Sequence, residues 1–181
     1  MVIDRYGTFS GTTNHNETDE DTTWQSKEIT GVSVDRTTSL GLWSYAKDFD
    51  EAARIVASKD EQRVSIPAYY LICHAIELAL KAFLRGSGAT LTDLRQLGHD
   101  LNKCFDRALS YNLLSYCGLS VNQQTAIKMM AEYYGAKELE YIVTGFKRFP
   151  EIEVLLSASA TILDGITGFC FSKRGLFERE E

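Results

Sequence analysis

Three polar residues stand inside the most apolar stretch of this chain. Residues 66–84 are apolar almost throughout, yet they include His74, Glu77 and Lys81. This spacing puts all three on one face of a helix, and a glutamate four residues before a lysine favours an ion pair. We prefer the simpler interpretation, a semi-buried ion pair with His74 satisfied nearby. The functional interpretation is a polar pocket in which a histidine acts as acid, base or ligand.

A second polar cluster, residues 98–101, separates two further apolar stretches. Asp100 in this cluster is well suited to cap the helix that follows. In the functional interpretation, His99 completes the polar pocket, with Arg95 as an additional member. The pocket then consists of His74, Glu77, Lys81, His99 and Asp100.

The segment 137–149 is another place where the residue types suit a ligand. Basic side chains interleaved with aromatic ones are typical of surfaces that bind phosphates and bases. We prefer the simpler interpretation, a loop held by its aromatic side chains with solvated basic residues. The phosphate or RNA contacts of the functional alternative are Lys137, Lys147 and Arg148, next to Tyr141, Phe146 and Phe149.

Metal and nucleophilic chemistry find little support in the sequence. A di-iron bundle needs Glu-x-x-His motifs on two helices, whereas this chain has one reversed His74-x-x-Glu77 and 3 histidines in all. No glycine-rich phosphate loop and no serine elbow has the required spacing. We therefore expect no metal and no cofactor.

The cysteines form no CxxC pair, and we expect buried free thiols at Cys73, Cys104, Cys117 and Cys170.

The elements that must position these residues follow a helical periodicity. Only 2 prolines are present and hairpin signals are lacking, which favours helices over strands. Short connections favour antiparallel neighbours. The sequence predicts an all-α antiparallel bundle of four to five helices, with the most apolar helix at its centre. The expected helices span 39–58, 65–86, 101–114 and 122–134, with a last one opened by Pro150 and a short helix or turn at 92–97.

The composition divides the chain into an arm, a bundle and a tail. Residues 1–38 are acidic and lack periodicity, so we expect a flexible arm before a bundle at 39–172 and a polar tail at 173–181. Residues 1–40 contain seven acidic and three basic residues and so carry −4 of the net charge of −6. The nearly neutral remainder argues against a strongly electrostatic, non-specific nucleic-acid binder.

The apolar run at 66–84 approaches the length of a membrane span. Two of its residues, Glu77 and Lys81, are charged and lie well inside it, which favours the core helix of a soluble protein. The N-terminus lacks the apolar region of a secretory signal. We therefore expect a cytoplasmic protein that does not enter a membrane.

The motif His74–Ala82, a glycine-containing gap and then His99-Asp100-Leu101 resemble the HEPN domain superfamily. Members of that superfamily show an A-x-E-x-x-L-K-A helix and open the next helix with H-D-L. The resemblance covers roughly residues 42–166. It implies an all-α bundle, frequent homodimers and roles in prokaryotic toxin–antitoxin, phage-defence or RNA-processing systems. Many members are metal-independent ribonucleases.

The ribonuclease signature of that superfamily, an arginine followed after a short gap by a histidine on a late helix, is missing here. Only three residues separate Arg95 from His99, Arg95 lies too early in the chain, and no histidine follows His99. Glu140, next to Tyr141, stands where many members carry an arginine.

We therefore predict a non-catalytic HEPN-like binding or accessory protein. We expect a homodimer that takes a nucleotide, an RNA or a protein partner. The alternative is a divergent metal-independent ribonuclease that uses His99 with Arg95 or Lys81. A third interpretation is a purely structural or partner-binding protein whose acidic arm folds over an apolar groove.

Overall fold

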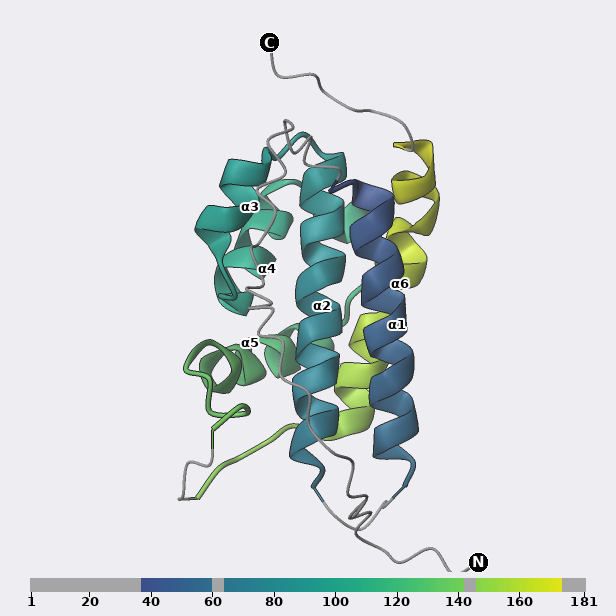
Figure 1. Cartoon of the computed structure of the whole chain (residues 1–181). Helices are drawn as coiled ribbons and strands as arrows, with labels where there is room; N and C mark the ends of the chain where they lie inside the picture. Colours follow the sequence, from purple (N-terminus) through teal and green to yellow (C-terminus); the bar gives the residue numbers. More distant parts are fainter. Residues whose placement is uncertain (1–36, 60–63, 142–145, 174–181) are drawn as a thin grey trace, which may run out of the picture. The chain divides into compact units, whose positions relative to one another are not determined.

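The computed structural model describes residues 37–59, 64–141 and 146–173 (Figure 1). The chain separates into two compact units, Met1–Val34 and Asp35–Glu181, and all described residues belong to the second. The predicted arm therefore lies outside the described residues apart from its last two positions, and the predicted tail lies outside them apart from Lys173.

The described residues are helical and contain no strand, which confirms the all-α class. The described residues form six α-helices, whereas four to five were predicted. The additional one is the short segment at 91–97, which was predicted as a helix or turn. In chain order the elements are α1 (Ser39–Ala57), α2 (Ile66–Gly86), α3 (Leu91–Leu97), α4 (Leu101–Ser110), the 3-10 helix η1 (Leu113–Ser115), α5 (Val121–Gly135) and α6 (Ile152–Ser172).

Side-chain caps fix the helices around the polar cluster. Thr90 and Asp93 form a reciprocal capping box, which makes the short segment α3 helical. Asp100 accepts a hydrogen bond from the Lys103 backbone N–H at 3.0 Å, as predicted for the start of α4. Such caps each contribute about 1 kcal/mol. The chain between α3 and α4 is therefore a short link, and the Asp100 cap fixes its α4 end.

Two predicted helix boundaries are wrong. The helix expected to reach residue 114 ends at Ser110, because Asn112 adopts a left-handed conformation with a φ of 65°. Pro150 does not open the last helix, since Glu151 is the N-cap and α6 begins at Ile152. The Pro150 carbonyl instead accepts a hydrogen bond from the Tyr69 hydroxyl at 2.6 Å.

The central helix is α2, as the sequence predicts. It contacts α1, α3, α4, α5 and α6, and α1 runs antiparallel beside it (Figure 1). All four cysteines are free and buried. Burial raises the pKa of the Cys104 thiol to about 12, so this thiol is a poor nucleophile at neutral pH.

By length and composition alone, both α2 and α6 are apolar enough to cross a membrane, with mean hydropathies of 1.3 and 1.6. Such helices are weak evidence, because the buried core helix of a soluble protein has the same composition. Within the most apolar 18-residue window of α2, 61% is buried in the bundle, and the corresponding share for α6 is 39%. The cytoplasmic location remains a prediction.

Gly165 allows α6 to approach the chain after η1. A Cβ atom at this position would lie 2.5 Å from the Tyr116 carbonyl oxygen and 2.6 Å from the Cys117 Cβ. Real Cβ atoms do not come this close to backbone atoms. The packing of α6 against this segment therefore requires glycine here.

Replacing Gly165 with alanine should lower the free energy of unfolding by roughly 1–3 kcal/mol, because the added methyl overpacks the contact. Urea denaturation measures this change. The matched control is Gly168→Ala on the same helix, where a Cβ meets nothing within 4 Å. That control should be neutral or stabilising by up to about 1 kcal/mol. Equal stabilities for the two variants would contradict the close approach.

Candidate functional site

The carboxylate of Glu77 is the centre of the polar cluster. Its side chain is 1% exposed, and Lys81 Nζ lies 2.6 Å from Oε1. The Tyr134 hydroxyl donates to Oε2 at 2.6 Å, and His99 Nδ1 lies 3.1 Å from Oε1. One carboxylate on α2 thus holds the α3–α4 link, which carries His99, and α5, which carries Tyr134. We call Glu77, Lys81, His99, Tyr134 and His74 the Glu77 network.

Lys81 is committed to two acceptors. Besides Glu77, its ammonium group donates to the Gly98 carbonyl in the α3–α4 link. The Lys81 side chain is 12% exposed, so the Glu77–Lys81 pair is largely removed from water. A buried ion pair is costly unless further hydrogen bonds use its remaining capacity, and here Lys81 has a second acceptor while Glu77 has donors besides Lys81.

Glu77 is ionised at neutral pH despite its burial. Burial by itself raises the pKa of Glu77, but hydrogen bonds from its neighbours and the charge of Lys81 outweigh burial and lower this pKa to about 2. Lys81 and Tyr134 donate two of these hydrogen bonds, and a histidine lies beside the same carboxylate. Of the two histidines, His99 lies closer, because His74 Nδ1 is 3.7 Å from Oε2. Burial and the Glu77 charge raise the pKa of Tyr134 well above its usual range, so its hydroxyl remains a donor.

The network fixes the tautomers of both histidines. The Tyr134 hydroxyl donates its hydrogen bond to Glu77, so its oxygen accepts one from His74 Nδ1, 2.8 Å away. An ionised carboxylate only accepts hydrogen bonds, so His99 Nδ1 must also carry a hydrogen. In the neutral form of each ring, Nε2 therefore holds the lone pair. This assignment rests on the hydrogen-bond partners, which is how tautomers are inferred.

The two histidines differ in accessibility. The His74 side chain is 19% exposed, and its ring packs against Phe49 in an edge contact at 4.5 Å and against Tyr70 in a stacked contact at 6.1 Å. The His99 side chain is 72% exposed. His74 therefore belongs to the packed wall, whereas His99 offers its Nε2 to solvent and to a ligand.

A cavity of about 370 Å³ brings the predicted polar residues together. His74, Glu77, Lys81, Arg95 and His99 all line it. Asp100 does not line it, because its carboxylate caps α4 and pairs with Lys103 at 3.0 Å. Leucines form the apolar wall of the cavity, namely Leu42, Leu78, Leu91 and Leu94.

Sequence reasoning missed Tyr134 and the leucine wall. Tyr134 lies 57 residues from Glu77 in the chain, and no local spacing links the two. The leucines look like ordinary core positions in the helical pattern. One feature of the sequence could have indicated Tyr134. A buried glutamate carboxylate has more acceptor positions than Lys81 alone can fill, so a further hydrogen-bond donor is expected.

His74, Glu77 and His99 form a group whose potential metal-binding atoms lie within 4.8 Å of one another. The same atoms already serve the Glu77 network. Lys81 occupies the cation position on Oε1, and both Nδ1 atoms act as donors. A metal would have to displace Lys81 and remove the Nδ1 hydrogens, so the contacts favour a cluster held by hydrogen bonds.

The basic and aromatic segment is partly tied to the bundle. Lys147 Nζ pairs with Glu138 Oε2 at 2.8 Å, and Phe149 packs against Tyr69 and Tyr133. Lys147 is therefore engaged within the loop, while Lys137 and Arg148 are exposed. Residues 142–145 of this segment lie outside the described residues. Of its aromatic residues, Phe149 is packed against the bundle, whereas Tyr141 and Phe146 are 66% and 89% exposed.

Neither a protein-family model, a curated protein nor a solved structure matches this chain. The resemblance to the HEPN superfamily therefore remains a prediction from short motifs. The function must be argued from the Glu77 network and from the cavity beside it.

Replacing Glu77 with glutamine should destabilise the protein by about 3–5 kcal/mol, because it leaves the buried Lys81 charge without its partner. Chemical denaturation at pH 7 measures the loss. The control is Glu51→Gln, an exposed residue of α1, which should change stability by less than about 0.5 kcal/mol. A small effect at Glu77, equal to that at Glu51, would rule out the buried ion pair.

The stabilisation from Glu77 should depend on pH with a defined sign. The pKa of Glu77 falls from an ordinary 4.5 to about 2 in the folded protein, so its contribution is complete above about pH 5 and disappears as the pH falls to about 2. The loss amounts to roughly 3 kcal/mol. Since Asp93 and Asp100 also have lowered pKa values, the test compares the wild type with Glu77→Gln at each pH. A stability difference that does not shrink between pH 7 and pH 3 would contradict the assignment.

Proposed function

We propose that this chain is a non-catalytic HEPN-like helical protein that acts as a binding or accessory module. The proposal rests on one observation: the Lys81 ammonium group donates hydrogen bonds to both Glu77 and the Gly98 carbonyl. A nuclease based on this cluster would need a free cation or acid beside its histidine. The Glu77 network instead ties its charged groups to one another and holds the α3–α4 link against α2.

The cavity beside His99 is the binding site of this proposal. Its leucine wall suits an apolar side chain, and His99 Nε2 provides an exposed acceptor for an N–H or O–H donor. A peptide segment of a protein partner offers both features. The resemblance to the HEPN superfamily adds the expectation of a homodimer that serves a prokaryotic toxin–antitoxin, defence or RNA-related system.

A second candidate is a divergent metal-independent ribonuclease. It is favoured by His99, which a buried carboxylate holds in one tautomer with Nε2 exposed, and by Arg95 and Lys81 in the same cavity. In that reaction Nε2 would take the proton of a 2′-hydroxyl, whose oxygen attacks the adjacent phosphorus. The bond from phosphorus to the 5′ oxygen would break, that oxygen would take a proton from solvent, and a 2′,3′-cyclic phosphate would remain.

One assay separates the two candidates. Purified full-length protein is incubated with a mixed pool of tRNA and mRNA in the presence of EDTA, beside His99→Ala and the surface variant Lys128→Gln. Our proposal predicts no cleavage above buffer for any of the three proteins. Cleavage by the wild type and Lys128→Gln that disappears in His99→Ala would overturn it and establish the ribonuclease.

A further inference from the structure

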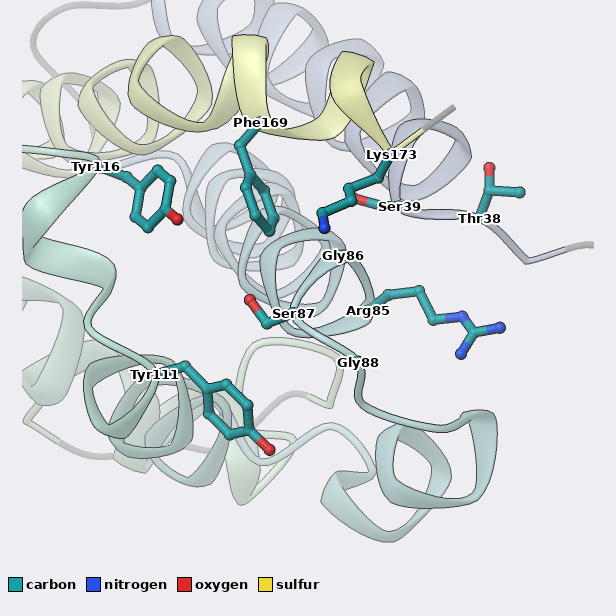
Figure 2. A pocket seen from close by; sticks show the side chains of 10 residues that line it. All are labelled: Thr38, Ser39, Arg85, Gly86, Ser87, Gly88, Tyr111, Tyr116, Phe169 and Lys173. Atoms are coloured by element: carbon teal, nitrogen blue, oxygen red, sulfur yellow. The ribbon is translucent and has the colours of Figure 1, made fainter. Parts of the chain in front are cut away.

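A second cavity, of about 420 Å³, lies where the C-terminal ends of α2 and α6 meet the start of α1 (Figure 2). It shares no lining residue with the cavity beside His99. Lys173, the last described residue, lines it. The chain therefore continues into residues 174–181 from the rim of this cavity. Neither the Glu77 network nor the proposed function makes use of it.

Aromatic rings line the side of the cavity next to Lys173. Figure 2 shows Phe169 and Tyr116 on that side and Tyr111 across from them. Phe169 lies four residues before Lys173, and its ring meets that of Tyr116 edge to face at 5.0 Å. Both rings pack against the buried Phe83, each at 5.2 Å, so the core holds them in place. Tyr116 is nevertheless 43% exposed, and this fixed surface can accept a further apolar side chain.

Two cations border the cavity at separate places. Arg85 donates from Nε to the Thr37 carbonyl at 3.2 Å and from Nη1 to the Ala89 carbonyl at 2.9 Å. Its guanidinium group therefore points away from Lys173 and from the aromatic rings (Figure 2). Within the described part of the chain, no carboxylate lines the cavity. Two cations that point in different directions cannot share one small anion, but they suit a chain segment that carries several carboxylates.

The sequence of residues 174–181 matches this lining. The segment contains two adjacent apolar residues, Leu176 and Phe177, and three acidic ones, Glu178, Glu180 and Glu181. Four extended residues span up to about 14 Å, so Phe177 can reach the ring of Phe169, one helical turn before Lys173. The acidic residues after Phe177 would then meet a rim that has cations and no carboxylate among the described residues.

We propose that residues 174–181 bind in this cavity of their own chain, with Phe177 against the rings of Phe169 and Tyr116. The apolar pair alone would suit many surfaces, and the acidic residues alone would suit any cationic patch. The cavity offers both features at the point where the segment begins. The bound segment connects the end of α6 to the chain after η1 and closes the cavity to other ligands.

Nuclear Overhauser contacts test this placement in the full-length protein. A ¹³C-edited NOESY spectrum should show contacts from the Phe177 ring to the rings of Phe169 and Tyr116. In Phe177→Ala the Tyr116 ring signals should shift, whereas in Phe146→Ala they should keep their positions. Phe146 is the matched control, because its side chain is 89% exposed. A Phe177 ring without contacts to either aromatic ring would overturn the proposal.

Limited trypsin digestion measures how firmly the segment is held. Trypsin cleaves after arginine, and Arg174 begins the segment. Cleavage follows the fraction of molecules in which the segment is released, so Phe177→Ala should be cut at least about fivefold faster than the wild type. Tyr116→Ala should be cut faster as well, because it alters the cavity and leaves the cleaved sequence intact. Circular dichroism checks the folding of this variant.

The control Phe146→Ala should be cut at the rate of the wild type. Equal rates for the wild type and Phe177→Ala would overturn the proposal and leave the cavity to another occupant. Protection that increases with protein concentration would assign the cavity to the same segment of a second copy, which also overturns binding within one chain.

Discussion

The ionised carboxylate of Glu77, buried in the middle of α2, is the constraint on which this bundle depends. A charge at that depth is stable only if every one of its acceptor positions is used. Lys81 supplies the counter-charge from the same helix, while His99 and Tyr134 bring donors from distant parts of the chain. The hydrogen bonds from His99 and Tyr134 that stabilise the Glu77 charge therefore also hold the α3–α4 link and α5 against α2.

Both cavities follow from this arrangement of helices around α2. The first is formed because the α3–α4 link is held close to α2 at Glu77, with His99 at its rim. The second lies at the C-terminal end of α2, where Gly86 accepts Phe169 at a distance that a Cβ would not allow.

The helices and half of the Glu77 network could be predicted from the sequence, because these features depend on residues close together in the chain. The spacing of His74, Glu77 and Lys81 predicted a shared helix face, and Asp100 predicted a cap. What the sequence could not show depends on residues distant in the chain. Tyr134 completes the network from another helix, 57 residues from Glu77. The left-handed Asn112, which ends α4 early, is likewise not encoded in a periodic pattern.

The most direct test of this account is a ¹³C NMR titration of the Glu77 side-chain carboxyl in the folded protein, with Glu51 as the exposed reference. We predict that Glu77 stays ionised from pH 7 down to about pH 3, since its pKa is lowered to about 2. A Glu77 carboxyl that takes up its proton at or above the pH at which Glu51 does would contradict the account.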